Sequence, residues 1–144
     1  MTLEEQVAEL AAKEAIRALP QRYCDCVWRD DTDGLAGLFT EDGSFIAVMP
    51  ESSMTVSGRD AILGMFQQAL GMKPRPYIHN HVIEMKGTDQ ASGRCYLDLR
   101  AGRQNLEIMG AGYYEDEYRR VDGEWFFQSR RYIALRMDEL PDGF

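Results

Sequence analysis

The sequence predicts an α+β fold, in which helices come first and an antiparallel sheet follows. Three stretches in the first half of the 144-residue chain carry apolar residues at a helical spacing of three to four. The second half holds runs rich in Val, Ile, Tyr, Phe and Trp, which favour strands. We expect a single domain over residues 1–144, with the helices in the hollow of a strongly curved sheet that encloses a space.

The predicted helices cover residues 3–30, 32–39 and 60–70. Pro20 should kink or divide the first helix, because proline removes a backbone hydrogen bond and clashes with the preceding turn. The second helix starts at Thr32-Asp33, and either residue can cap it.

Strands are predicted at residues 44–49, 77–86 and 91–100, before a long hairpin. Pro74 and Pro76 should keep the segment before the second strand irregular. No strand is predicted between the first strand and the third helix. The tail, residues 136–144, contains a proline and a glycine and should be loose.

The hairpin, residues 110–135, turns at Asp122-Gly123, because glycine reaches the positive φ that a tight turn requires. A two-residue turn would pair Glu115 with Arg130, whereas a three-residue loop with a glycine bulge would pair Tyr114 with Arg130. We favour the longer loop. It gathers aromatic and polar side chains on one face, as a small-molecule pocket needs: Tyr114, Asp116, Tyr118, Phe126, Gln128, Arg130 and Tyr132. The alternative is a solvated face with cross-strand ion pairs, such as Arg130 with Asp116 or Glu115.

The opposite face of the hairpin would carry Trp125, Phe127 and Ile133. An apolar outer face must be covered. We therefore expect a homo-oligomer, either a dimer or a trimer.

The only two histidines, His79 and His81, alternate with Ile83 and Met85 along one predicted strand. If Ile83 and Met85 face the interior, both histidines do so too, and we favour His81 in the pocket. Buried imidazoles are costly without partners, which suggests a function. The alternative is a half-exposed histidine at a strand end, hydrogen-bonded to the backbone.

The net charge of −8 argues against a nucleic-acid partner. No apolar run reaches membrane length, and the acidic start differs from a secretory signal. The spacing of Cys24, Cys26 and Cys95 favours neither a disulfide framework nor a metal site, so we interpret them as core residues. We expect a cytoplasmic protein with no metal, no membrane partner and no nucleic-acid partner.

Four strings carry a resemblance to a known family: KEAIRALPQRY, DTDGLAGLFTEDGSF, GRDAI and GYYEDEYRRVDGEWFF. With the order of elements, they make the chain similar to the SnoaL-like division of the nuclear transport factor 2 superfamily. The resemblance implies a cone-shaped, cystatin-like fold, whose curved antiparallel sheet encloses a pocket capped by N-terminal helices. Relatives of this kind include scytalone dehydratase, bile acid 7α-dehydratase and polyketide cyclases. The lyases among them use no cofactor, and an Asp-supported His abstracts a proton from a bulky apolar substrate.

The chain departs from that pattern at both members of the Asp–His pair. Counting from Tyr23 places Trp28 where the dehydratases have the acid, and an ungapped match places Pro76 where they have the histidine. The resemblance assigns Tyr23 and Arg130 to the pocket. There the phenol could polarise a substrate oxygen and the guanidinium could hold negative charge. The alternative for Tyr23 is an ordinary core tyrosine.

Together with the resemblance, these observations predict a cofactor-independent lyase of aromatic compound catabolism. It would eliminate water or another small leaving group, or cleave a C–C bond, in a bulky aromatic or polycyclic small molecule. Proton transfer would fall to Tyr23 and to His81 or His79, with Arg130 as the anion partner. The other residues of the predicted pocket are Trp28, Phe45, Tyr77, Tyr114, Asp116, Gln128 and Tyr132. The alternative is a non-catalytic binding or accessory protein of the same fold, including one like an oxygenase β subunit, and an isomerase or cyclase is less favoured.

Overall fold

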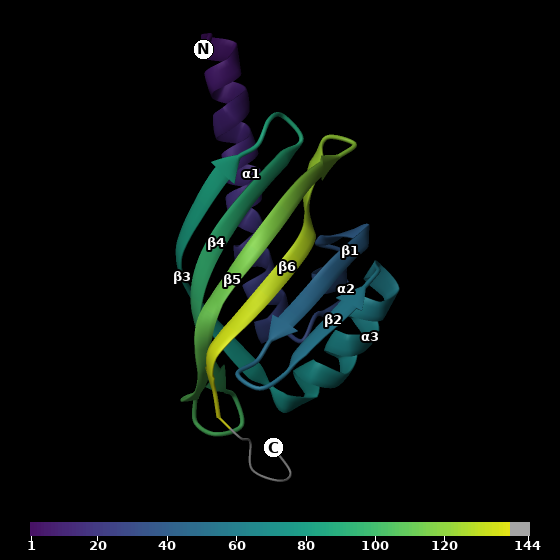
Figure 1. The fold of residues 1–144 in the computed structure, drawn as a ribbon, viewed down its shortest axis with the longest axis vertical. Helices are drawn as coiled ribbons and strands as arrows, with labels where there is room; N and C mark the ends of the chain where they lie inside the picture. The colour runs from purple at the N-terminus through teal and green to yellow at the C-terminus, as the bar shows by residue number, and fades with distance from the viewer. Residues whose placement is uncertain (139–144) are drawn as a thin grey trace.

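The structure, a computed structural model, describes residues 1–138. Six strands form one sheet in the order β2-β1-β6-β5-β4-β3, and the helices lie against one of its faces (Figure 1), which confirms the predicted α+β fold. The elements are α1 (Leu3–Trp28), α2 (Thr32–Ala36), β1 (Phe39–Val48), β2 (Ser53–Ser57), α3 (Arg59–Ala69), the 3-10 turn η1 (Leu70–Met72), β3 (Pro74–Met85), β4 (Gln90–Ala101), β5 (Glu107–Val121) and β6 (Glu124–Met137).

Helix α1 is a single helix that starts at a capping box, in which Thr2 accepts from the Glu5 backbone and the Glu5 side chain accepts from the Thr2 backbone. Pro20 is buried inside it without dividing it. The first turns project beyond the sheet (Figure 1), and the rest packs under β3 and β6. Helix α2 is capped by Asp31 and not by the predicted Thr32 or Asp33.

Three features of the sheet differ from the prediction. Strand β1 runs parallel to β6, so the sheet is not antiparallel throughout. Strand β2 was not predicted, because it is a short edge strand with mostly exposed residues, and Met54 and Val56 alone give too short an alternation to indicate a strand. Strand β3 begins at Pro74, earlier than predicted, since an edge strand tolerates prolines whose missing N–H faces away from the ladder.

The hairpin uses the two-residue turn, so the favoured three-residue loop is wrong. Asp122 and Gly123 have φ of 51° and 81°, and Val121 pairs with Glu124. A bulge at Gln128 then shifts the register, because Tyr118 pairs with Phe127 but Glu117 pairs with Ser129.

This bulge changes which residues of β6 face inward. Trp125 and Phe127, predicted on the outer face, are buried in the core. Phe126 and Gln128, predicted on the inner face, are not part of it; Gln128 instead contacts Arg119 and Asp42 among exposed side chains. Beyond the bulge, Arg130 and Tyr132 point inward together with Tyr114 and Asp116, as predicted.

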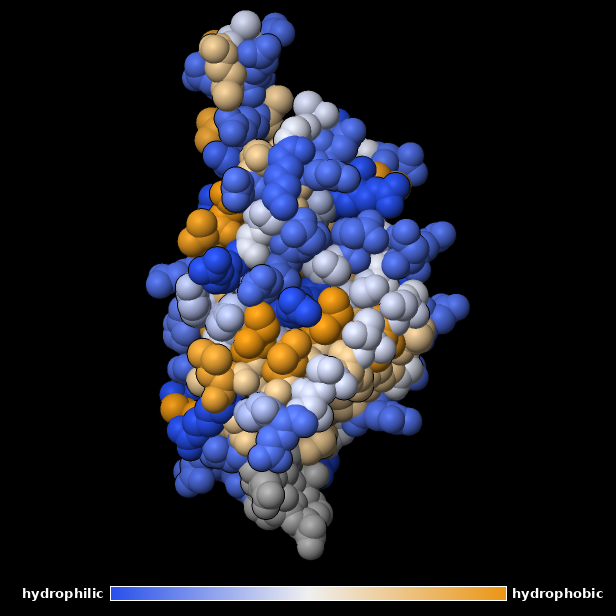
Figure 2. Space-filling model, in the orientation of Figure 1, coloured by the Kyte–Doolittle hydropathy of each residue, from blue (hydrophilic) through white to orange (hydrophobic). Residues whose placement is uncertain are grey.

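The outer face of the sheet is polar at one end and apolar at the other (Figure 2). Exposed apolar residues on the strands include Val82, Tyr96, Ile108 and Leu135. An oligomer would cover these residues, and the homo-oligomer expected from the sequence stays a prediction. Within the described residues no helix is long and apolar enough to cross a membrane. Arg136 and Met137, predicted to be loose, belong to β6, and Asp138 follows the strand. Residues 139–144 of the predicted tail lie outside the described residues.

Candidate functional site

A second bulge, in β3, separates the two histidines. Asn80 has a φ of 40° and no partner on β4, because His79 pairs with Tyr96 and His81 pairs with Cys95. His81 therefore points inward with Ile83 and Met85. His79 turns to the Asp98 carboxylate, with 3.4 Å between Nε2 and Oδ2, and half of its side chain is exposed. The prediction that both imidazoles share the interior face is wrong.

His81 begins a chain of four polar side chains that runs into the core. Its Nε2 lies 2.8 Å from the Tyr118 hydroxyl, which donates to Asp116 Oδ2 at 2.9 Å. Asp116 Oδ1 lies 3.2 Å from Arg130 Nε, and both side chains of this ion pair are fully buried. Strand β3 supplies the imidazole, β5 the phenol and carboxylate, and β6 the guanidinium.

Gly93 on β4 makes room for this chain. A Cβ at this position would lie 2.9 Å from the Tyr118 hydroxyl and 2.8 Å from the Val82 carbonyl oxygen. Such distances are far shorter than a normal carbon contact. The missing side chain thus lets the phenol sit between His81 and Asp116.

The hydrogen bonds select one tautomer of His81. A phenol has a single proton, and Tyr118 donates it to Asp116. The phenol oxygen must therefore accept from His81 Nε2–H, which leaves Nδ1 with a free lone pair. This Nδ1 is buried and has no hydrogen-bond partner among residues 1–138.

The environment also keeps the His81 imidazole neutral. Burial, and then the charges of Arg130 and Arg17, lower the pKa of His81 to about 4. Burial raises the pKa of Asp116 to about 6, against the opposing effect of Arg130, so the carboxyl is mostly ionised at neutral pH. The site therefore combines an unprotonated base with a buried ion pair.

Arg130 lies among aromatic rings. Its guanidinium carbon is 3.4 Å from the Tyr114 ring centre, 4.2 Å from that of Tyr23 and 4.7 Å from that of Phe127. Burial is the largest influence and would lower the pKa of Arg130, but Asp116 together with the nearby tyrosine phenols raises it overall. Both terminal nitrogens are buried without a hydrogen-bond acceptor in the described chain. The ion pair that the sequence offered as an alternative for Arg130 is thus formed, in the core.

Aromatic side chains fill much of the interior that was predicted to be hollow. Tyr23 meets the rings of Phe66, Tyr114 and Phe127 at centroid distances of 5.8 to 6.0 Å. Phe45 packs on Phe66 at 5.2 Å, and Tyr132 on Tyr114 at 5.4 Å. Burial raises the pKa of the Tyr23 phenol above its ordinary range, which disfavours it as a base.

Trp28 and Tyr77 lie together at the end of α1. Their rings meet edge to face at 5.4 Å, and Trp28 Nε1 donates to the Pro76 carbonyl oxygen at 2.7 Å. Tyr77 is 39% exposed. The predicted aromatic walls are therefore split between the packed core and this edge.

The chain of four polar residues reaches the surface at a cleft between α1 and the edge strand β3. The cleft has a volume of about 260 Å³. It is lined by Arg17, Pro20, Gln21, Ile78, His79, Asn80, His81 and Cys95. Of the predicted site residues, only the two histidines border it. Arg17 and Gln21 were missed, because exposed polar residues on a long acidic helix carry no distinguishing signal in the sequence.

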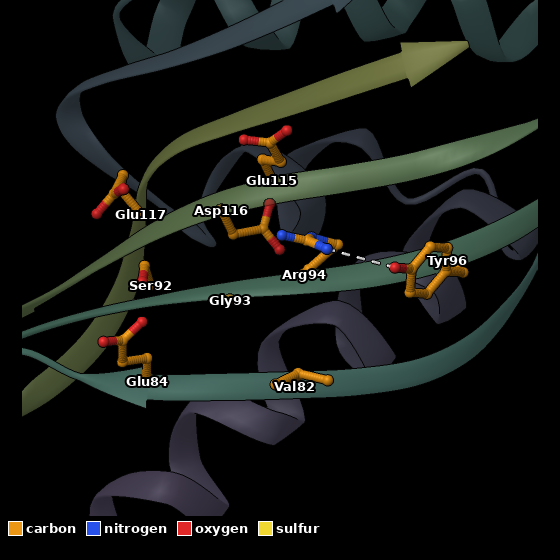
Figure 3. A pocket seen from close by; sticks show the side chains of 9 residues that line it. All are labelled: Val82, Glu84, Ser92, Gly93, Arg94, Tyr96, Glu115, Asp116 and Glu117. Carbon is orange, nitrogen blue, oxygen red and sulfur yellow. Dashed lines mark hydrogen bonds between the residues drawn. The ribbon is translucent and has the colours of Figure 1, made fainter. Parts of the chain in front are cut away.

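A second hollow, of about 310 Å³, lies where β3, β4 and β5 adjoin. Figure 3 shows Glu84, Glu115 and Glu117 around the Gly93 backbone, with Arg94 directed to the Tyr96 hydroxyl at 3.5 Å. Its border is thus rich in exposed carboxylates, and it shares only Asp116 with the polar chain. Among residues 1–138, no group of three or more His, Cys, Asp or Glu side chains is arranged to hold a metal ion.

The N-terminal helix and the six-stranded sheet define an α+β protein, and solved structures with a similar arrangement have a cystatin-like fold. Residues 8–131 match the SnoaL-like domain family, and the chain belongs to that family, as its sequence motifs predicted.

Solved structures of other proteins have a similar fold. A protein of unknown function from Mycobacterium tuberculosis is 30% identical, with a TM-score of 0.76 over 97% of this chain and 78% of that one. An NTF2-like protein with a cystatin-like fold from Novosphingobium aromaticivorans is 22% identical, with a TM-score of 0.81, and the match covers 99% of this chain and 90% of that one. A protein of the same organism, named provisionally as a scytalone dehydratase, is 22% identical, with a TM-score of 0.75, and the match covers 96% of this chain and 98% of that one. The last two likenesses establish the fold alone.

Proposed function

We propose that this protein is a cofactor-independent lyase in which His81 is the general base. The observation that carries the proposal is the neutral imidazole whose Nε2–H is fixed by Tyr118 and whose Nδ1 is left without a partner. A general base needs a free lone pair and must be unprotonated at the working pH. The Tyr118–Asp116 pair would orient the ring, as a carboxylate does in an Asp–His pair.

The proposed reaction is an elimination of water from a β-hydroxy carbonyl compound. His81 Nδ1 takes the proton from the carbon next to the carbonyl, and the electrons of that C–H bond form the new double bond. The C–O bond breaks with its electron pair on oxygen, and the imidazolium returns the proton to this leaving group. Water and a regenerated neutral His81 result. The positive charge of Arg130 would stabilise the developing enolate at a distance.

The experiment is a turnover assay without any added cofactor, on β-hydroxy ketones and acids that carry one aromatic ring. The conjugated product is followed by its ultraviolet absorbance and by mass spectrometry. His81→Ala should lower kcat/KM by about 10²- to 10⁴-fold, whereas His79→Ala, whose imidazole turns to Asp98, should lose less than about tenfold. Equal losses in the two variants would contradict the role of His81.

A second candidate is a binding protein of the same fold. It is favoured by the tight aromatic packing around Tyr23, which leaves no large interior space at this level. Stabilisation by ligands with no product in any assay would support this candidate over the lyase.

A further inference from the structure

The cleft beside His81 differs in charge from the rest of the molecule. The chain has 24 acidic and 16 basic residues, yet none of the eight residues that line this cleft is Asp or Glu. Its polar lining consists of one guanidinium, two amides and the His81 imidazole, whereas the His79 imidazole turns to Asp98. The hollow on the other face, by contrast, is bordered by three glutamates (Figure 3). A cleft without carboxylates in so acidic a chain is suited to a negatively charged ligand.

Arg17 supplies the positive charge at this cleft. No carboxylate lies within 4.0 Å of its guanidinium in the described part of the chain. The same holds for six arginines outside this cleft, so Arg17 is distinguished by its place in the cleft and not by the missing partner. The guanidinium is close enough to His81 to affect the protonation of the imidazole. A planar guanidinium with free donors matches the two oxygens of a carboxylate.

Gln21, one turn further along α1, and Asn80, at the bulge of β3, add amide groups to the same lining. Both side chains can donate hydrogen bonds to a carboxylate oxygen. Ile78, Pro20 and Cys95 provide the apolar part of the surface. The volume of about 260 Å³ lies just below the roughly 300 to 1,000 Å³ of most drug-sized ligand sites, which favours a compact ligand.

We propose that the cleft binds a monocyclic aromatic carboxylate, whose carboxylate group pairs with Arg17 and whose side chain lies against His81. Arg17 is then a specificity-determining residue rather than a catalytic one. This inference rests on the site proposed for the lyase, and it narrows the substrate from aromatic compounds in general to small aromatic acids.

The test is calorimetric titration with cinnamate and cinnamamide, which have nearly the same shape and differ in charge. The wild-type protein should bind cinnamate about tenfold or more tightly than cinnamamide, because a charge-assisted pair is lost with the amide. Arg17→Gln should remove this preference, and Arg17→Lys should keep part of it. Arg22→Gln, on the same helix but bordering a different groove, should behave as wild type.

Equal binding of the acid and the amide, or an unchanged preference in Arg17→Gln, would overturn the inference. Acetate should bind far more weakly than cinnamate; if it competes equally, Arg17 attracts anions without a built site and the inference fails. The outcome is separable from the lyase proposal. A charge preference without turnover leaves this inference standing, and turnover of neutral ketones without a charge preference leaves only the lyase.

Discussion

Two aspartate–arginine pairs of this protein have nearly equal distances between nitrogen and oxygen and opposite surroundings. In the core, Arg130 Nε lies 3.2 Å from Asp116 Oδ1, and neither side chain is exposed. On the solvent side, Arg120 Nε lies 3.1 Å from Asp89 Oδ1, with 43% and 64% of the side chains exposed. Water screens the exposed pair and can replace either partner, whereas the buried pair has no substitute. Distance alone therefore says little about what each pair contributes.

The largest expected effect is the loss of one partner of the buried pair. Asp116→Asn leaves the Arg130 charge uncompensated in the core and weakens the acceptor of Tyr118, so it should lower the free energy of unfolding by about 3–5 kcal/mol. Asp89→Asn should change it by less than about 0.5 kcal/mol. Urea denaturation of both variants measures the contrast. Similar losses in the two variants would mean that burial does not change what such a pair contributes to stability.

A double variant distinguishes the cost of an unpaired charge from the cost of lost packing. Asp116→Leu with Arg130→Met replaces both charges by apolar groups of similar size and should recover much of the stability lost in Asp116→Asn. Recovery would assign the loss to an unpaired charge. No recovery would assign it to the packing of the Tyr23 and Tyr114 rings around the guanidinium.

A smaller effect is expected from filling the space that Gly93 leaves inside the sheet. Gly93→Ala places a methyl group against the Tyr118 hydroxyl and the Val82 carbonyl, and should lower the free energy of unfolding by about 1–3 kcal/mol. Gly64→Ala is the matched control, because Gly64 lies in α3 with no atom within 4 Å of the added carbon. It should stabilise the protein by about 0.5–1 kcal/mol. A harmless Gly93→Ala would mean that Tyr118 can move without cost.

Much of the inner face could be predicted from alternation along the strands. The grouping of Tyr114, Asp116, Arg130 and Tyr132 follows from their shared parity, and the inward direction of His81 follows from Ile83 and Met85. The predicted side-chain directions are wrong where a bulge adds one residue to a strand. At the bulges of Asn80 and Gln128, the residues on one side of the bulge face opposite to what simple alternation predicts. Neither residue signals a bulge in the sequence.

The cleft itself could not be predicted, because it depends on how α1 packs against the edge strand β3. Arg17 and His81 are far apart in the sequence, and only tertiary packing brings both to one surface. The same holds for the pairing of Tyr118 with His81, which requires β4 between them to carry a glycine at position 93. Local patterns specify elements and faces, whereas these contacts depend on element packing.

The smallest effect is a pH dependence that distinguishes the buried groups from each other. The pKa of His81 is lowered from 6.5 to about 4, so the unfolded chain binds more protons between those values, and His81 makes stability increase with pH there. The pKa of Asp116 is raised from 3.8 to about 6, so its contribution falls as pH rises through that window. The two slopes oppose each other, and the wild-type curve shows only their difference.

His81→Gln removes the rising contribution and should expose the falling one. Relative to wild type, the variant should become less stable as pH rises from 4 to 6.5, by about 1 kcal/mol or less, because the half-buried ring is partly screened by solvent. Urea denaturation across this range measures the difference. The NMR titration of the His81 ring provides the check: a midpoint near 4 is expected, and Arg17→Gln should move it upward by removing a nearby positive charge. A midpoint between 6 and 7 would mean that water reaches the imidazole freely. The inner face of the sheet would then not shift the pKa of His81.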